Sequence, residues 1–143
     1  MAEFTYNPIQ LVPANQAVIF NNSIMCPKRY VLHRNESGIV ILRGIVNNPS
    51  SCFARYQVTF NGNIAVPEDG TVGPISVALS IDGEALPTSR AIVTPAAVDQ
   101  YFNVTSTAFI TVPKGCCYSV AIENAGTTPV LVQNVNCIVE RTA

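Results

Sequence analysis

The stretch Ser76-Val77-Ala78-Leu79-Ser80-Ile81-Asp82-Gly83 decides the fold class of this chain of 143 residues. Its apolar side chains Val77, Leu79 and Ile81 occur at every second position, which is the period of a β-strand and not of an α-helix. The Asp-Gly pair that follows suits a tight hairpin turn, because glycine adopts a positive φ without steric cost. This stretch therefore predicts an antiparallel β-hairpin.

The same alternation recurs in three further segments. Apolar side chains take most second positions in residues 56–60, 101–112 and 118–122, with mostly polar side chains between them. Strands of this pattern pack one face against a core and expose the other face to a more polar environment. Gly and Pro turn signals separate the strands, and no segment carries the apolar spacing of an amphipathic helix. About eight to ten short strands without a helix predict a single all-β domain, either a sandwich or a barrel.

Composition limits the classes of partner. Hydrophobic residues make up 48 % of the chain and charged residues 12 %, with a formal net charge of −1. Nucleic acid is therefore not an expected partner, because phosphate neutralisation needs clustered Lys and Arg. No membrane partner is expected either, since no apolar run approaches the roughly 18 residues of a membrane span. The first residues lack the basic and apolar stretches of a secretory signal, so we expect synthesis in the cytoplasm.

Two segments break the alternation because they are apolar on both faces. The first is Gly38-Ile39-Val40-Ile41-Leu42-Arg43-Gly44-Ile45-Val46, in which Arg43 alone is charged, and the second is residues 129–140. A strand that is apolar on both faces is covered on both faces. In a small sandwich the second cover comes from another subunit or, alternatively, from an N-terminal arm. We accordingly divide the chain into an arm at residues 1–14, free to dock on a neighbour, and one domain at residues 15–143.

The order and spacing of these segments carry a resemblance. Ile9-Gln10-Leu11-Val12-Pro13 comes first, a glycine opens the apolar strand at Ser37-Gly38-Ile39, and an aromatic-rich strand follows at residues 53–60. Val112-Pro113-Lys114-Gly115 then leads into a further strand, and the closing strand of Val and Asn ends in Val139-Glu140-Arg141. The pattern resembles the trimeric jelly rolls of the tumour-necrosis-factor and complement-globular-head type, in their bacterial and phage versions, over residues 9–141.

The resemblance implies a jelly-roll sandwich of about ten antiparallel strands that packs as a homotrimer around a three-fold axis. In such trimers one sheet of each subunit is buried against its neighbours, which would account for the two apolar strands. The candidate interface residues lie in the arm and in these two strands, and they are Phe4, Tyr6, Ile41, Arg43, Ile45, Asn134, Asn136, Ile138 and Glu140.

The polar residues of this set would need hydrogen-bond or charge partners in a buried interface. Arg43 requires a carboxylate or carbonyl partner, because an unpaired buried charge is costly, and Glu140 is a candidate within one subunit or across the interface. On a three-fold axis, equivalent asparagines would hydrogen bond one another and set the register. These asparagines are Asn134 and Asn136, which we expect to share one face of the closing strand with Val130, Val132 and Ile138. The alternative is that Asn134 and Asn136 are simply exposed to solvent at one end of the strand.

The cysteines allow two interpretations. None of the five, Cys26, Cys52, Cys116, Cys117 and Cys137, forms a C-x-x-C pair, and the single histidine His33 cannot complete a Cys/His zinc pattern. Free, buried thiols are expected after synthesis in a reducing cytoplasm. Cross-linking of subunits through Cys116 and Cys117 is the alternative, because adjacent residues of a strand point to opposite faces.

Catalytic motifs are absent from the sequence. There is no Gly-x-Ser-x-Gly elbow, no glycine-rich phosphate loop and no His-Glu-x-x-His. A lone histidine such as His33 is usually structural. A calcium ion shared by loop carboxylates stays open, although a solvated Glu-Asp-Gly turn is the simpler interpretation; those carboxylates are Glu68, Asp69, Asp82, Glu84 and Asp99. We predict no enzyme, no catalytic residue, no metal site and no cofactor.

These expectations combine into a functional hypothesis. The chain is expected to be a non-enzymatic, self-assembling structural protein, a homotrimer that decorates a phage virion or capsid. The alternatives are a subunit of a spore surface or appendage, and a trimeric module that binds a glycan or a receptor through loops at residues 61–74 and 85–95. The expected location is the virion surface, or otherwise a spore or cell surface.

Overall fold

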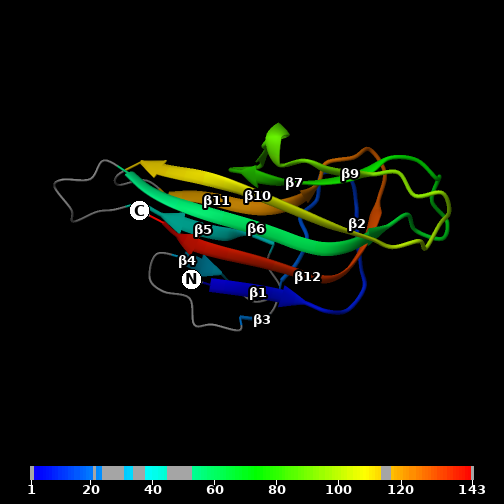
Figure 1. The fold of residues 1–143 in the computed structure, drawn as a ribbon, viewed down its shortest axis with the longest axis horizontal. Helices are drawn as coiled ribbons and strands as arrows, with labels where there is room; N and C mark the ends of the chain where they lie inside the picture. The colour runs from blue at the N-terminus through cyan, green and yellow to red at the C-terminus, as the bar shows by residue number, and fades with distance from the viewer. Residues whose placement is uncertain are drawn as a thin grey trace.

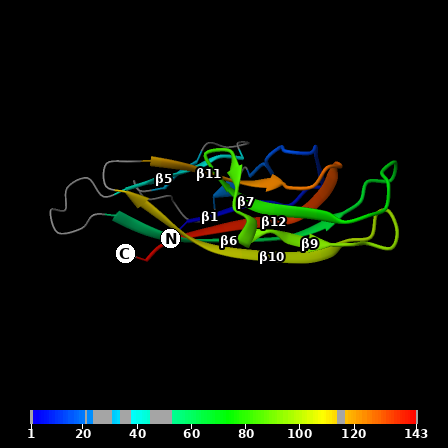
Figure 2. The ribbon, with the colours of Figure 1, turned by 90° about the horizontal axis from the view of Figure 1, so that it is seen from above.

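The computed structural model describes residues 2–20, 22–23, 31–33, 38–44, 53–113 and 117–142. Within these residues, twelve strands form two antiparallel sheets that lie one above the other as a sandwich (Figure 1). Figure 2 shows the two layers from the side, with β5 and β11 in one layer and β6, β10 and β12 in the other. We call the two layers sheet A and sheet B.

Sheet A has the order β10-β6-β12-β1-β3, and β2 also pairs with β12. The strands β1 and β2 pair with successive parts of β12, so they share one position and the sheet is five positions wide. Their bounds are β1 Ala2–Tyr6, β2 Gln10–Val12, β3 Asn22–Ser23, β6 Phe53–Ala65, β10 Phe102–Pro113 and β12 Val130–Arg141.

Sheet B has the order β4-β5-β11-β7-β8, and β9 pairs with the same edge of β7 as β8 does, so this sheet is also five positions wide. The expectation of about ten antiparallel strand positions in an all-β sandwich is confirmed. No helix among the described residues is long and apolar enough to cross a membrane. The bounds are β4 Val31–His33, β5 Val40–Arg43, β7 Ile75–Ile81, β8 Glu84–Ala85, β9 Ala91–Val93, β11 Cys117–Asn124 and the 3₁₀ helix η1 Pro87–Ser89.

The core lies between the two sheets. Its largest fully buried side chains include Tyr56, Phe4, Phe20, Phe60 and Leu42. The hydroxyl of Tyr56 on β6 donates a hydrogen bond to the carbonyl of Arg43 on β5. This bond satisfies the one polar atom of a wholly buried ring and ties the two sheets together.

The hairpin expected at Asp82-Gly83 is present. Ile81 pairs with Glu84, and the two turn residues have φ angles of 52° and 87°. The carboxylate of Asp82 accepts hydrogen bonds from the backbone N–H and the hydroxyl of Ser119, at 3.0 and 2.9 Å. We expected one face of β7 to be exposed to solvent. That face is buried, because Ser76 and Ser80 are only 2 % and 1 % exposed.

The closing strand β12 contains a β-bulge between Gln133 and Asn136, where Asn134 has a φ of 53°. The extra residue reverses which side chains face the core. Val132 points inward before the bulge, whereas Val135 and Cys137 point inward after it. The prediction that Asn136 and Ile138 share a face with Val130 and Val132 was therefore wrong.

The loop expected at residues 61–74 begins later than predicted, because β6 continues through Asn61-Gly62 to Ala65. Gly62 lies directly opposite the bulge region. A Cβ atom at this position would lie 2.7 Å from Cγ1 of Val135 and 3.2 Å from Cζ of Phe60. The glycine is thus required by close packing against neighbouring side chains and not by a turn.

The N-terminal segment is built into the sandwich of its own chain. Residues 2–6 form β1, in which Ala2 pairs with Val139 and Phe4 pairs with Cys137. The expectation that this segment is free to dock on a neighbour is corrected by this pairing, which buries Phe4 completely. The division of the chain at residue 14 stays a prediction. Because β1 and β12 are antiparallel, both chain ends emerge at the same end of the sandwich (Figure 1).

Candidate assembly surface

The outward side of sheet A is a broad, polar surface that carries little charge. We call it the assembly face. The alternating burial of β6, β10 and β12 assigns its side chains. Its charged members are Glu3, Glu140 and Arg55. The uncharged polar members are Thr5, Gln57, Thr59, Asn61, Asn63, Asn103, Thr105, Thr107, Thr111, Gln133 and Asn136. The apolar members are Leu11, Phe53, Phe109, Pro113, Leu131 and Ile138.

Rows of uncharged polar side chains cross this face. The register places Thr5, Asn136, Asn61 and Thr105 in one row across β1, β12, β6 and β10. In this row the hydroxyl of Thr105 donates to Oδ1 of Asn61 at 2.9 Å. Such cross-strand pairs hold side chains in fixed positions on the sheet.

The neighbouring rows repeat the arrangement. Nδ2 of Asn103 donates to Oδ1 of Asn63 at 3.2 Å, and the hydroxyls of Thr59 and Thr107 are 3.1 Å apart. Three consecutive rows between β6 and β10 are therefore joined by side-chain hydrogen bonds. The result is an ordered strip of the surface in which each of these six side chains has a hydrogen-bond partner on the neighbouring strand.

Asn136 occupies the middle of the face. Its Nδ2 donates to the carboxylate of Glu3 at 3.2 Å. Its Oδ1 is buried and has no hydrogen-bond partner among the described residues. A buried acceptor without a partner costs free energy, so this position is less well satisfied than the rows beside it.

One corner of the face is aromatic. The ring of Phe109 on β10 is 56 % exposed, and the guanidinium carbon of Arg55 on β6 lies 4.9 Å from its centroid. A cation over an aromatic face is attracted by the ring quadrupole. The charge of Arg55 is thus held against an apolar neighbour at the edge of the face.

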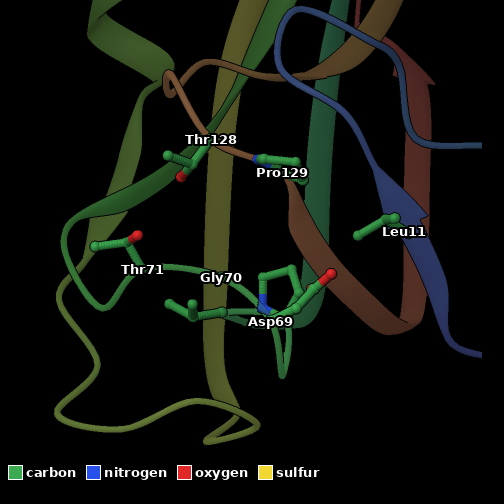
Figure 3. A pocket seen from close by; sticks show the side chains of 8 residues that line it. Leu11, Asp69, Gly70, Thr71, Thr128 and Pro129 are labelled. Atoms are coloured by element: carbon green, nitrogen blue, oxygen red, sulfur yellow. The ribbon is translucent and has the colours of Figure 1, made fainter.

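A shallow pocket of about 290 Å³ lies where β2, the segment after β6 and the turn before β12 come together (Figure 3). Leu11, Pro67 and Pro129 contribute apolar walls, and Asp69 is the charged residue of the lining. No group of three or more His, Cys, Asp or Glu side chains that could hold a metal ion occurs among the described residues.

Comparison with solved structures identifies the architecture. The globular domain of zebrafish complement 1qA protein superposes with a TM-score of 0.58 and 14 % identity, over 96 % of this chain and 94 % of that chain. Murine APRIL superposes with a TM-score of 0.63 and 12 % identity, over 97 % of this chain and 98 % of that chain. The fold is the tumour-necrosis-factor/complement-head jelly roll.

The resemblance expected from the sequence is thereby confirmed at the level of the fold. The PRD1 vertex protein P5 also matches, with 14 % identity over 95 % of this chain and 93 % of that chain, at a TM-score of 0.42 that is too low to establish a common fold. No protein-family model matches the chain, and no curated protein sequence matches it.

The predicted interface residues do not lie on one surface of the jelly roll. Some lie on the assembly face, some in the core and some on the outer side of sheet B. Asn136, Ile138 and Glu140 lie on the assembly face, and Asn134 lies exposed at the bulge beside it. Tyr6 is partly buried and packs against the core. Phe4 is wholly buried inside its own subunit, so its side chain is not part of an outer surface.

The residues from β5 lie on the opposite side of the jelly roll. Ile41 is 36 % exposed and Arg43 is also exposed, both on the outward side of sheet B. Arg43 and Glu140 therefore do not pair within one subunit, because they are on opposite outer faces of the sandwich. Arg43 needs no carboxylate partner, since water solvates its guanidinium. Ile45 lies outside the described residues.

Two of the five cysteines belong to the described residues. Cys117 is exposed at the start of β11, and Cys137 is buried on β12. Burial raises the pKa of the Cys137 thiol to about 12, which makes it a poor nucleophile at neutral pH. Cys116, Cys26 and Cys52 lie outside the described residues, so cross-linking through Cys116 and Cys117 stays a prediction.

The hydrogen-bonded rows of the assembly face were not found from the sequence. The candidate residues there came from β12 alone, whereas the rows are made largely by β6 and β10. A signal was available, because every outward position between residues 57 and 63 and between residues 103 and 107 is Asn, Gln or Thr. Only the pairing of β6 with β10 converts these two polar sets into one surface.

Proposed function

We propose that this chain is a self-assembling structural protein that forms a homotrimer through its assembly face and decorates the surface of a phage virion. The observation that carries the proposal is the scarcity of charge at the centre of the assembly face. The two central rows of this face contain only Asn, Gln and Thr side chains.

Physical reasons connect an uncharged face to self-assembly. The buried centre of a protein interface is depleted of charged residues, whereas free surfaces carry many of them. A charge near a three-fold axis would meet two copies of itself at short distance, with unfavourable Coulomb energy. Folds of the tumour-necrosis-factor/complement-head type typically trimerise, which supports three copies as the number.

Ile138 provides the sharpest test of the trimer. This half-buried side chain lies in the row next to Asn136, and a lysine there would place three like charges in the interface. Light scattering after size exclusion is expected to give three times 15.3 kDa for the natural chain and loss of that trimer for Ile138→Lys. Ile92→Lys is the matched control, because Ile92 is 58 % exposed on β9 of sheet B. A monomeric natural chain contradicts the proposal.

The virion as the decorated particle rests on the resemblance to phage members of the fold. Quantitative mass spectrometry of purified virions, produced by a host that carries this coding sequence, is expected to find the protein at a fixed ratio to the major capsid protein. Binding to immobilised glycans without any presence in virions would favour the alternative, a trimeric binding module. Recovery of the protein in purified spore coats or appendages instead would favour a subunit of that surface.

A further inference from the structure

The pocket between β2, the segment after β6 and the turn before β12 lies away from the centre of the assembly face. It is at the end of the sandwich opposite the chain termini, because β12 begins there at Val130 and pairs with Ala2 near its other end (Figure 1). Of its eight lining residues, Leu11 alone belongs to the assembly face, where it pairs with the start of β12. The pocket is therefore built within one subunit.

Hydrogen bonds hold the walls of this pocket in place. The side chain of Asn124, which is wholly buried, donates to the carbonyls of Val12 at 3.0 Å and Thr128 at 2.8 Å. It thereby joins the end of β2 to the turn before β12. On another wall, the N–H of Gly70 donates to the carbonyl of Pro67 at 2.9 Å and closes a tight turn. The pocket is thus formed by the protein itself, as most ligand sites are.

Three polar side chains of the lining are available to a ligand. Figure 3 shows Asp69, Thr71 and Thr128 around the pocket. Among the described residues, neither the Asp69 carboxylate nor the hydroxyl of Thr71 or Thr128 has a hydrogen-bond or ion-pair partner. The carboxylate only accepts hydrogen bonds, whereas each hydroxyl donates or accepts. These groups therefore suit a ligand that carries several hydroxyl groups.

The rest of the lining is mainly apolar, and no aromatic side chain occurs among its described residues. Leu11, Val66, Pro67 and Pro129 supply this apolar surface. The volume of about 290 Å³ lies at the lower end of the range of ligand pockets, which is about 300–1,000 Å³. The pocket therefore has room for one small ring that presents an apolar face to these walls.

The chemistry of the lining disfavours other ligand classes. Asp69 is the one charged group among the described lining residues, so an anion would be repelled. One carboxylate is too few for a calcium ion, which takes six to eight oxygen ligands. Organic cations are typically recognised by aromatic faces, which this lining lacks. A neutral ligand with hydroxyl groups fits the pocket best.

We infer that this pocket binds one pyranose ring, the terminal unit of a glycan. Such a ring has C–H groups on its faces, which pack against the proline rings and the leucine of the lining. Hydroxyl groups surround its rim. Two adjacent hydroxyls donate to the Asp69 carboxylate, and others reach the hydroxyls of Thr71 and Thr128. Hydrogen bonds to a carboxylate are stronger than those between neutral groups, so Asp69 is the main polar anchor.

The sugar site does not depend on the proposed trimer or on the virion. Each subunit carries its own pocket, so a homotrimer carries three. Three weak sites engage a surface with many glycan ends more tightly than one site does. A trimer that binds no sugar would overturn the site and leave the trimer standing. A monomer that binds sugar would do the reverse, so the two failures are distinguishable.

The first test is a titration of the natural chain followed by two-dimensional NMR of its backbone amides. The probes are the methyl pyranosides of glucose, galactose, mannose and N-acetylglucosamine. Each is added to about 50 mM, because one small ring in an open pocket binds with a dissociation constant on the order of 1–10 mM. At least one probe is expected to shift the amide signals of Gly70, Thr71 and Thr128. No such shift with any of the four overturns the inference.

An organic cation is the competing probe. n-Butylammonium chloride is titrated in the same way and is expected to leave these amide signals unchanged. Shifts of Gly70, Thr71 and Thr128 with the ammonium, and none with the glycosides, would assign the pocket to a cation and overturn the sugar site.

Substitution of the carboxylate locates the contact. Asp69→Asn keeps the size of the side chain and is expected to weaken binding of the active glycoside at least about tenfold, because hydrogen bonds to a charged group are lost. Glu68→Gln is the matched control, since Glu68 is the neighbouring exposed carboxylate and does not line the pocket. It is expected to bind as the natural chain does. Full affinity in Asp69→Asn, or equal loss in both variants, contradicts the assignment.

Two adjacent threonines test the opposite wall. Thr128→Val removes a lining hydroxyl but keeps the shape of the side chain and the carbonyl that accepts from Asn124. It is expected to weaken glycoside binding at least about threefold. Thr127→Val is the matched control, because Thr127 is exposed and does not line the pocket. Equal affinities of the two variants would place the sugar elsewhere and overturn the site.

Discussion

Gly62 and Val135 are in such close contact that any Cβ atom at position 62 would lie 2.7 Å from Cγ1 of Val135. The two residues belong to adjacent strands, β6 and β12, next to the bulge at Asn134. The bulge turns Val135 toward the core, and the missing side chain of Gly62 leaves room for it. Local backbone geometry and core packing are therefore coupled at this point of sheet A.

Gly62→Ala is expected to destabilise the subunit by about 1–3 kcal/mol, because an added methyl group in a packed core forces its neighbours to move. Urea unfolding measures the change. Gly73→Ala is the matched control, since no heavy atom lies within 4 Å of a Cβ there, and it is expected to change stability by no more than about 0.5 kcal/mol. Equal effects of the two substitutions would show that the Val135 contact relaxes freely.

The positive φ of Asn134 makes a second prediction about the bulge. Asn134→Val is expected to lower the free energy of unfolding by about 1–2 kcal/mol, because a β-branched residue strains the left-handed region. Asn134→Gly is expected to stay close to the natural chain. Both variants keep the N–H that donates to the carbonyl of Asn7 at 3.3 Å. Denaturant unfolding that ranks valine equal to glycine contradicts this view of the bulge.

Phe4 tests whether the N-terminal segment stabilises its own subunit. Phe4→Ala is expected to cost about 3–5 kcal/mol of unfolding free energy, because it removes a wholly buried ring from the core. Ile9→Ala is the matched control in the same segment, where 53 % of the side chain is exposed. If Phe4→Ala weakened assembly but left the unfolding of isolated subunits unchanged, the segment would act between copies instead.

The buried thiol of Cys137 predicts a pH dependence. Burial raises its pKa from 9.0 to about 12, so the folded protein keeps this proton while the unfolded chain loses it above pH 9. Unfolding then releases a proton, and the free energy of unfolding falls as pH rises from 9 toward 12. The contribution of this thiol to the slope is at most about 1.4 kcal/mol per pH unit.

The measurement compares urea unfolding of the natural chain and Cys137→Ala at several pH values between 8 and 11. Other titrating groups are common to both proteins, so the difference between the two slopes isolates the thiol. Identical slopes would mean that Cys137 titrates alike in folded and unfolded chains. Peptide mapping after treatment with a thiol reagent at pH 8 is expected to find Cys117 labelled and Cys137 protected.

The fold was largely predictable, because apolar and polar residues alternate along a strand when one face of its sheet is buried and the other is not. Val77, Leu79 and Ile81 predicted β7, and Asp82-Gly83 predicted its turn, both of which the structure contains. Alternation fails where one residue is added to a strand. The bulge at Asn134 reverses the pattern without leaving a gap in the sequence, so Asn136 and Ile138 were assigned to the face of Val130.

The candidate surface was less predictable, because it depends on which strands are neighbours. Arg43 and Glu140 were joined by charge complementarity, but β5 and β12 belong to different sheets. Asn61 and Thr105 are far apart in the sequence and hydrogen bond only because β6 and β10 pair. Side-chain type predicts the inward or outward direction along one strand, whereas long-range pairing assembles the surface.

The shared end of the two chain termini has a mechanical consequence. Ala2 pairs with Val139 at the start of the ladder between β1 and β12. A force that pulls the termini apart would therefore open this ladder one hydrogen bond at a time, as a zipper opens, and would not shear all of its bonds at once. The subunit is thus expected to yield at low force when it is stretched by its ends, however stable it is toward urea.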